Sequence, residues 1–386
     1  MTKLEELIQK LCPNGVEHKP LNEVSEMKRG TSITKKDIVE GEIPVVSGGR
    51  EPAYYCDKYN RDGETITVAG SGAGAGYVQY WTKPIFVCDA FSIQGNPGIQ
   101  TKYIYYFLTN IQDYIYSTKK GGGVPHVHIS SIENVSVPVP TLPVQREIVR
   151  ILDNFTELTA ELTAELTARK QQYAYYRDKL LTPRTDYRHG KIIDMLKQPI
   201  TDGPHTTPEL MEDGIPFLSV EAVFDGKIHF EKRRGNITPE FDAECCKKYK
   251  PQKHDIFMVK SGSTTGKVGY VDTDERFNIW SPLAAMRVNS ENSSRYLFHL
   301  LQSKMVQQQV VAKASHGSQP NLSMRALEQF DVVIPPLDIQ LRLANVLDNF
   351  DAICTDLNIG LPAEIEARQK QYEYYRDKLL TFTPAD

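Results

Sequence analysis

The chain has 386 residues, a length that predicts two or three domains. Hydrophobic residues make up 40% of it and no run of 18 apolar residues occurs, so we expect well-formed cores and no membrane span. A net charge of −4 argues mildly against a protein that grips the DNA backbone alone, but not against a subunit whose assembly supplies the positive surface.

The chain begins with MTKLEELIQKL, which is polar and predicts a short amphipathic helix, not a signal peptide. The apolar positions of this helix are Leu4, Leu7, Ile8 and Leu11. The six cysteines show no CxxC pair and no metal-ligand spacing. This pattern favours reduced thiols in a cytoplasmic protein.

Two variable bodies, at 1–143 and 183–336, contain short alternating stretches separated by Gly-, Ser- and Pro-rich turns. In the first we expect strands at 42–49, 64–70, 76–81 and 85–93, a helix at 103–116 and a last strand at 133–140. In the second we expect strands at 215–220, 255–262, 267–272 and 283–289, a helix at 296–311 and a last strand at 328–336. Each body is therefore predicted to be an α+β globule.

Each body is followed by a segment rich in helix formers. Residues 144–182 contain no glycine and predict one long helix with coiled-coil spacing toward its end. Its apolar stripe comprises Leu152, Phe155, Leu158, Leu162, Leu166, Tyr173, Tyr176 and Leu180. Residues 337–386 predict a second helix, interrupted at 360–362 by Gly-Leu-Pro, with the stripe Leu347, Phe350, Ile365, Tyr372, Tyr375 and Leu379.

The chain is an internal duplication. YYRDKLLT occurs at 175–182 and at 374–381, and QREIVRILDNF at 145–155 matches QLRLANVLDNF at 340–350. Inside the bodies, Ile-Pro at 43–44 recurs at 215–216, and Gly-Tyr-Val at 76–78 recurs at 269–271. The simplest arrangement is an antiparallel coiled coil of the two helices with a pseudo-twofold axis and a body at each end. The alternative is two independent domains that each bury an ordinary core helix.

The first helix carries a shorter repeat, with ELTA at 157–160, 161–164 and 165–168. Each four-residue unit lengthens a helix by about 6 Å and rotates its end by about 40°. The repeat is either a neutral slippage of the gene or a ruler that spaces what the two bodies hold.

The sequence offers little catalytic chemistry. The segment SGSTTGK at 261–267 lacks the first glycine and the final Ser or Thr of a phosphate-binding loop, so a tight hairpin is preferred. The glycines at 70–76 do not satisfy GxGxxG, and His126 and His128 have no third ligand nearby in the sequence. We therefore expect no catalytic residue, no metal and no cofactor in this chain.

Polar loops rich in Lys, Arg, Ser and Asn recur at corresponding places in both halves, with different residues. Such side chains pair with phosphates and base edges, although each one alone is more often plain solvated loop. In the first body the candidate DNA-binding residues are Lys28, Arg29, Thr31, Ser32, Ser47, Arg50, Ser71, Lys119 and Lys120. In the second they are His205, Thr206, Lys260, Ser261, Ser263, Lys313, His316, Gln319 and Asn321.

Taken together, the variable bodies, the LDNF…YYRDKLLT segments, the lead-ins PTLPVQREI and PPLDIQLRL and the ELTA units resemble the specificity subunit of type I restriction-modification enzymes. The resemblance covers essentially the whole chain. It implies two target-recognition domains that read the halves of a bipartite, asymmetric DNA site from the major groove, with spacer helices at 144–182 and 337–386.

The resemblance also implies partners. Two methyltransferase subunits would bind S-adenosylmethionine and methylate adenine N6, and restriction subunits would use ATP and Mg. The identical placement of Arg177 and Arg376 suggests a role in docking these partners or in packing the helices. Two alternatives remain at this stage: a self-sufficient methyltransferase or nuclease, and a coiled-coil scaffold that joins two protein-binding domains without DNA readout.

Overall fold

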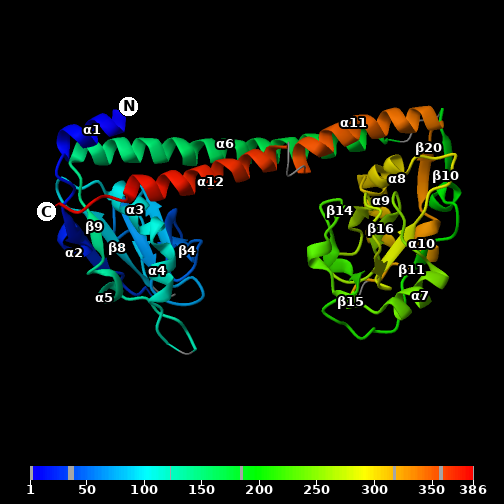
Figure 1. Ribbon diagram of the computed structural model, residues 1–386, viewed down its shortest axis with the longest axis horizontal. Coiled ribbons are helices and arrows are strands. Elements are labelled where there is room, and N and C mark those ends of the chain that lie inside the picture. Colours follow the sequence, from blue (N-terminus) through cyan, green and yellow to red (C-terminus); the bar gives the residue numbers. More distant parts are fainter. Residues whose placement is uncertain are drawn as a thin grey trace. The chain divides into compact units, whose positions relative to one another are not determined.

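The computed structural model describes residues 3–33, 39–121, 123–182, 186–315, 319–355 and 360–385. The chain forms two compact units (Figure 1). Unit 1 comprises Met1–Glu161 and Ile365–Asp386, and unit 2 comprises Leu162–Glu364. The long helix α6 (Leu142–Leu180) contributes residues to both units, so each unit is a body with helical segments attached.

In unit 1 the body is built on three small sheets. An antiparallel four-stranded sheet has the order β2-β8-β5-β6, a three-stranded sheet has the order β4-β3-β7, and β1 pairs with β9. The strands are β1 (His18–Pro20), β2 (Ser25–Arg29), β3 (Ile43–Val46), β4 (Tyr54–Cys56), β5 (Thr65–Ala69), β6 (Val78–Trp81), β7 (Phe86–Val87), β8 (Ala90–Gly95) and β9 (Ser136–Pro138).

Unit 2 repeats this topology sheet by sheet, with the orders β11-β19-β16-β17, β15-β12-β18 and β10-β20. The strands are β10 (Arg188–Lys191), β11 (Thr201–Asp202), β12 (Ile215–Leu218), β15 (Gly235–Ile237), β16 (Ile256–Val259), β17 (Val268–Tyr270), β18 (Asn278–Ile279), β19 (Leu283–Met286) and β20 (Asp331–Ile334). Unit 2 also has the small hairpin β13 (Val223–Phe224) and β14 (Lys227–Ile228). The duplication predicted from the sequence is therefore confirmed at the level of strand order.

Short helices complete the two bodies. Unit 1 has α1 (Lys3–Leu11), α2 (Leu21–Val24), α3 (Thr101–Asn110), α4 (Gln112–Ser117) and α5 (Ile129–Ile132). Unit 2 has η1 (Ile192–Met195), η2 (Val220–Ala222), η3 (Phe230–Lys232), α7 (Pro239–Lys248), α8 (Ser294–Leu301), α9 (Lys304–Lys313) and α10 (Met324–Glu328). The expected N-terminal helix is confirmed, and Leu4 is buried in the core of unit 1.

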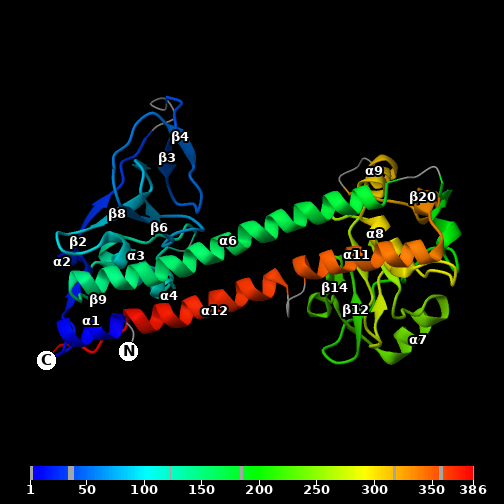
Figure 2. The same ribbon diagram turned by 90° about the horizontal axis from the view of Figure 1, so that it is seen from above.

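The segment after α1 meets the segment after α12 within unit 1 (Figure 2). The backbone N–H of Val16 donates to Thr383 O at 3.0 Å, and the N–H of Ala385 donates to Val16 O at the same distance. Gly15 lies so close to this segment that a Cβ there would come within 2.7 Å of Pro384 O. The last residues after the second helix thus belong to the fold of unit 1.

The second helical segment has the predicted break. Helix α11 (Leu337–Thr355) belongs to unit 2, and α12 (Leu361–Leu380) lies almost wholly in unit 1. Pro362 is the second residue of α12, a position at which a proline removes no helical hydrogen bond. Within the described residues, no helix is both long and apolar enough to cross a membrane.

The helices take part in the body cores. In unit 1, Val144, Ile148 and Leu152 of α6 and Leu380 of α12 belong to one buried cluster with the four-stranded sheet and α3. In unit 2, Tyr173 of α6 and Ala344 and Leu347 of α11 are buried with α8 and the sheet residues. The view that these helices are only a rod apart from the bodies would be incomplete, since each also serves as a core helix of its unit.

Three expectations for the bodies were wrong. The predicted helices at 103–116 and 296–311 are each two helices, because the chain turns at Ile111 and at Gln302–Ser303. Ser303 ends α8 by donating to Leu300 O at 2.6 Å and caps α9 by accepting from Val306 N. The predicted strand at 85–93 is divided between β7 and β8, which belong to different sheets.

The Gly-Tyr-Val match is also not a structural equivalence. The hairpins β5–β6 and β16–β17 both place left-handed glycines at the turn, Gly72 and Gly76 in one and Gly262 and Gly266 in the other. These glycines correspond with an offset of 190 residues, whereas the Gly-Tyr-Val offset is 193. Gly269 therefore lies inside strand β17, while Gly76 ends a turn.

Candidate nucleic-acid interface

A buried glutamine joins the helix to the body in each unit. In unit 1 the Gln145 side chain accepts from Gln100 N at 2.9 Å and donates to Pro140 O at 2.8 Å. In unit 2 the Gln340 side chain accepts from Ser293 N at 2.9 Å and donates to Pro335 O at 2.8 Å. The first residue of the repeated QxxxxxxLDNF motif thus makes the same two hydrogen bonds to the backbone in both units.

The aspartate of LDNF also attaches the helix to the body in both units, but its hydrogen-bond donors differ between the units. Asp153 accepts from the Tyr106 hydroxyl at 2.5 Å and pairs with Lys102 Nζ at 2.8 Å. Burial and this hydrogen bond raise the pKa of Tyr106, so its hydroxyl stays a donor. Asp348 accepts from His299 Nε2 at 2.6 Å and from Arg295 Nε at 2.8 Å.

Tyr173, His299 and Asp348 form a chain of hydrogen bonds that is buried at Tyr173 and His299 and half-buried at Asp348. Burial lowers the pKa of His299, and burial raises the pKa of Tyr173, so both side chains are neutral at pH 7. The Tyr173 hydroxyl lies 2.9 Å from His299 Nδ1 and donates to it, while Nε2–H donates to Asp348. Burial alone would raise the pKa of Asp348, but the hydrogen bonds from His299 and Arg295 outweigh it and lower the pKa.

Each YYRDKLLT segment packs against the LDNF segment of another helix: α12 packs on α6 in unit 1, and α6 packs on α11 in unit 2. In unit 1 the Phe155 ring stacks on Tyr375, with centroids 5.5 Å apart and an interplanar angle of 24°. In unit 2 the corresponding pair, Tyr176 and Phe350, has a separation of 5.7 Å and the same angle. In each unit one aromatic pair thus joins the two predicted stripes.

The two arginines of these segments face the bodies. Arg376 donates from Nε to Asn110 Oδ1 at 2.7 Å and lies 5.6 Å from the Tyr372 ring centroid. Arg177 lies 5.3 Å from the Tyr173 ring centroid. These contacts are to the body of unit 1 and to a tyrosine of the same helix, so the docking or helix-packing role of both arginines stays a prediction. Of the remaining stripe residues, Leu158, Leu162, Leu166, Leu180, Ile365 and Leu379 are all half-buried.

Both hairpins are held by the same clamp. In unit 1, Gly72 N donates to Pro125 O at 3.0 Å and Val127 N donates to Gly70 O at 3.0 Å. In unit 2, Gly262 N donates to Pro320 O at 2.9 Å and Leu322 N donates to Lys260 O at 2.7 Å. The predicted tight hairpin at 261–267 is confirmed, and the clamp brings Ser71 to His126 and Ser261 to Asn321.

Several unit 1 candidates gather around this hairpin. The guanidinium of Arg50 lies 5.0 Å from the Tyr77 ring centroid, Lys120 is paired through its backbone with His126, and Lys119 Nζ lies 4.3 Å above the Tyr116 ring. The Ser71 hydroxyl donates to Asp89. Ser47 begins the loop that reaches the hairpin.

The other unit 1 candidates lie at the end of β2. Arg29 lines a cavity of about 180 Å³ together with His126 and His128. Lys28 is paired with Glu26 at 2.7 Å, and Thr31 donates its backbone N–H to Val87 O. Thr31 and Ser32 are exposed.

In unit 2 the structure gives Lys260 another role. Its side chain is 13% exposed and lies 3.3 Å from Asp202, a carboxylate that is 1% exposed. Asp202 is also paired with Lys248 and lies 3.4 Å from His205 Nε2. Lys260 and His205 therefore compensate a buried charge inside unit 2, a pairing that the sequence did not reveal.

The remaining unit 2 candidates differ in their surroundings. Ser263 and Gln319 line a pocket of about 550 Å³, which Ser261 adjoins at the start of the same hairpin. Thr206 and Lys313 are exposed, and Asn321 accepts from Ser315 N at 3.0 Å. His316 lies outside the described residues.

Sequence reasoning missed two groups near these loops. Glu221 and Lys267 line the same pocket as Ser263. Arg234 lies 3.7 Å above the ring of Trp280. No motif marks Glu221 or Arg234, and Lys267 is only the last residue of the segment SGSTTGK. Among the described residues, no group of three or more His, Cys, Asp or Glu is placed to hold a metal ion.

Two bodies with one framework, one hairpin clamp and different exposed side chains define a duplicated recognition protein. Comparison with known proteins identifies the kind of recognition. The chain belongs to the family of the type I restriction modification DNA specificity domain, whose model matches residues 13–169 and 204–367. The predicted function, a sequence-specificity subunit with two target-recognition domains, is confirmed.

The chain is 33% identical to the type I restriction enzyme EcoR124I/EcoR124II specificity subunit of Escherichia coli, over 73% of this chain and 70% of that protein. It is 30% identical to a putative type I restriction enzyme specificity subunit of Haemophilus influenzae, over 99% of both chains. Among solved structures, the S subunit from M. genitalium has a TM-score of 0.59 at 17% identity and covers 94% of this chain. A chain from a study of complex assembly in the type I R-M system has a TM-score of 0.60 at 15% identity and covers 95% of this chain. The two structures support the predicted fold of duplicated α+β globules with long helices.

Proposed function

We propose that each unit reads one half of a bipartite, asymmetric DNA target through the surface around its clamped hairpin. The observation that carries this proposal is the contrast between the two units. The buried side chains of Gln145 and Gln340 make equivalent hydrogen bonds, whereas the exposed residues beside the hairpins differ, with Arg50 in unit 1 and Glu221 in unit 2. A framework that is held constant while exposed loops change is what two readers of different sequences require.

The chemistry of these loops suits double-stranded DNA. Arg29, Arg50 and Lys120 in unit 1 are exposed cations on loops with glycines, which permit close approach to phosphates. The hydroxyl and amide groups of Ser263 and Gln319 in unit 2 hydrogen-bond to base edges. The overall charge of −4 agrees with a reader that relies on partner subunits for much of its electrostatic affinity.

The helical segments dock the partners in this proposal. Tyr175 and Tyr374 occupy the same place in the two YYRDKLLT segments and are 60% and 61% exposed. Two equivalent exposed tyrosines in the two repeated segments suit the docking of two copies of one methyltransferase subunit. The structurally similar chain from the study of type I complex assembly supports an assembled state.

The chemistry in this proposal belongs to the partners. Methyltransferase subunits with S-adenosylmethionine would methylate adenine N6, and restriction subunits would use ATP and Mg. The specificity subunit contributes target choice and spacing, and the ELTA segment of α6 sets the number of base pairs between the half-sites.

The test exchanges the body of unit 2 for that of a relative and maps methylated adenines in a host that carries the methyltransferase. We expect one half-site to change and the other half-site and the spacer to persist. An unchanged target would refute reading by that body. If the assembled complex shows no sequence-selective DNA binding in a gel shift, the chain is instead a coiled-coil scaffold for two protein-binding domains.

A further inference from the structure

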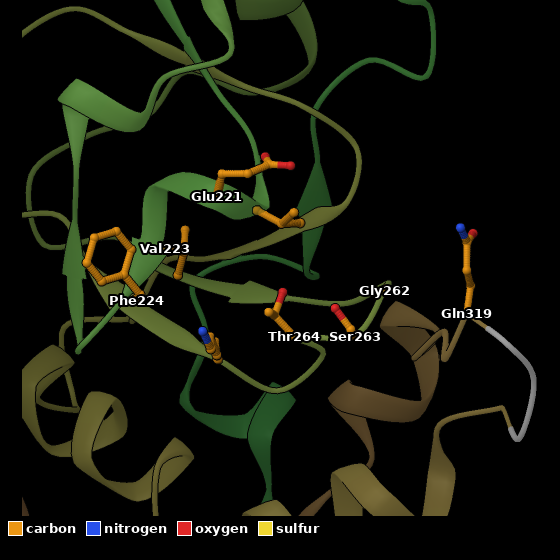
Figure 3. Close-up of a pocket in the computed structure, with 9 residues that line it drawn as sticks. Glu221, Val223, Phe224, Gly262, Ser263, Thr264 and Gln319 are labelled. Carbon is orange, nitrogen blue, oxygen red and sulfur yellow. The ribbon is translucent and has the colours of Figure 1, made fainter. Parts of the chain in front are cut away.

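The surface beside the hairpin of unit 2 contains a pocket of about 550 Å³. This pocket gives the two units different surface chemistry. It lies in unit 2 between η2–β13 and the tip of the β16–β17 hairpin (Figure 3). Glu221, Val223 and Phe224 line one side, and Ser263 and Thr264 line the hairpin side. In Figure 3 the hydroxyls of Ser263 and Thr264 point to the side of the hairpin on which Glu221 lies.

Unit 1 fills the corresponding place. The loop after β3 packs directly on the hairpin tip, so that a Cβ on Gly48 would lie 2.2 Å from Ser71 O and a Cβ on Gly74 would lie 2.4 Å from Gly48 O. Counting from the matching strands β3 and β12, Gly49 corresponds to Glu221. The pocket and its carboxylate are therefore a property of unit 2.

Glu221 is free to act on a ligand. Its side chain is exposed, and among the described residues no hydrogen bond or ion pair involves its carboxylate. A free carboxylate on a DNA-reading surface is repelled by phosphates, so it serves best where a base presents a hydrogen-bond donor. Lys267, an exposed cation in the lining of the same pocket, offsets this repulsion.

The major-groove edges of the bases show which base can donate to Glu221 without repelling it. In the major groove guanine presents two acceptors, and adenine presents its N6 donor beside the N7 acceptor. An ionised carboxylate only accepts, so adenine N7 and both guanine atoms repel it. Cytosine presents the N4 amine and otherwise an apolar C5 edge.

The apolar wall fits that edge. Val223 is held in the β13–β14 hairpin by pairing with Ile228, and the Phe224 ring stacks on His229 with centroids 3.5 Å apart. Both residues line the pocket on the side of Glu221, and because Val223 is 1% exposed, the half-buried Phe224 is the apolar side chain that a base can reach. We propose that Glu221 selects cytosine at one position of the half-site read by unit 2, by accepting a hydrogen bond from the N4 amine. This inference rests on the proposed function.

The test uses the full chain in its complex with the methyltransferase and maps methylated adenines. Glu221→Ala should lower the preference for cytosine at one position about tenfold, the discrimination expected of one good base contact. Glu221→Gln should admit adenine there, because an amide both donates and accepts. Glu240→Gln, an equal change of charge at an exposed position of α7, should leave the motif unchanged.

The outcomes separate this inference from the function beneath it. If both Glu221 variants keep the original motif while the exchange of the unit 2 body changes that half-site, the pocket does not read the base and the inference is wrong. If the body exchange changes neither half-site, the proposed function itself is wrong. A relaxed position other than a cytosine, or loss of all methylation by variants whose Trp280 fluorescence shows a folded unit 2, would also overturn the role of Glu221.

Discussion

The glutamine that begins each QxxxxxxLDNF motif should contribute strongly to the attachment of the long helix to the body. We consider Gln340→Met, which keeps the length of the side chain and removes its polar atoms. Gln340 is 1% exposed, and its side chain satisfies the backbone N–H of Ser293 at 2.9 Å and the carbonyl of Pro335 at 2.8 Å. The substitution leaves both backbone groups buried without a partner.

The expected cost follows from these two groups. Each buried backbone group left unsatisfied costs about 1–3 kcal/mol, so the sum is about 2–6 kcal/mol. Gln340 also donates to Asn292 Oδ1 at 2.8 Å, but Asn292 can turn to solvent and adds little. We expect a loss of about 2–4 kcal/mol in unit 2 after partial relaxation. Gln145→Met should cost less in unit 1, because Gln100 N is only partly buried.

The two tryptophans allow each unit to be followed separately. Trp81 lies in unit 1 and Trp280 lies in unit 2, and the sequence contains only these two. Urea unfolding followed by fluorescence in Trp81→Phe and Trp280→Phe backgrounds reports one unit at a time. Gln171→Met, at an exposed position of α6, is the matched control. A loss below about 0.5 kcal/mol for Gln340→Met, the range of ordinary surface changes, would refute the fastening role.

Three further predictions concern pH, spacing and docking. The pKa of His299 is lower in the folded chain than its usual value near 6.5, so the unfolded state binds more protons below that pH. The free energy of unfolding of unit 2 should fall as pH drops from 7.5 to 5.5, and an unchanged Trp280 urea midpoint would contradict this. Deleting residues 161–164 shortens α6 by about 6 Å and should change the number of unread base pairs without changing the bases read, as mapped from methylated adenines. Tyr175→Ser and Tyr374→Ser should each weaken methyltransferase binding in calorimetric titrations without shifting urea midpoints, and unaltered affinity would exclude these faces.

The duplicated framework could be predicted because its contacts join residues that both halves retain. Gln145 and Gln340, Asp153 and Asp348, and the stacked Phe–Tyr pairs all fall in the repeated segments. Strand pairing could be predicted less well. The stretch at 85–93 has the alternation of one strand, but a change of sheet between Val87 and Ala90 leaves no mark on that alternation.

Helix α7 carried a signal that the search for repeats did not use. Thr238 caps it by accepting from Phe241 N, Pro239 is its first residue, and Lys247 and Lys248 lie in its last turn. Among the described residues of the first half α7 has no counterpart, so the internal repeat does not predict it. Its ends are marked in the sequence by these capping residues alone.

The candidate site was the hardest part to predict, because its geometry joins segments that lie apart in the chain. Lys260 is a lysine in a polar loop by sequence, yet in the fold it compensates the buried Asp202. Glu221 is one acidic residue among many by sequence, yet the fold places it across a pocket from Ser263. Charge compensation and pocket formation are properties of the folded chain, and spacing along the sequence does not encode them.

Comparison of the two units also shows which residues a recognition protein of this fold can exchange. Asp153 and Asp348 are the same acceptor, but Tyr106 serves one and His299 the other, because any donor of fitting length satisfies a half-buried carboxylate. The donor residue differs between the units, but in both units a donor is paired with the aspartate. Glu221 has no partner among the described residues that must change with it. Substitutions there should therefore alter the target at little cost in stability, whereas exchanging one member of a buried pair requires a second change.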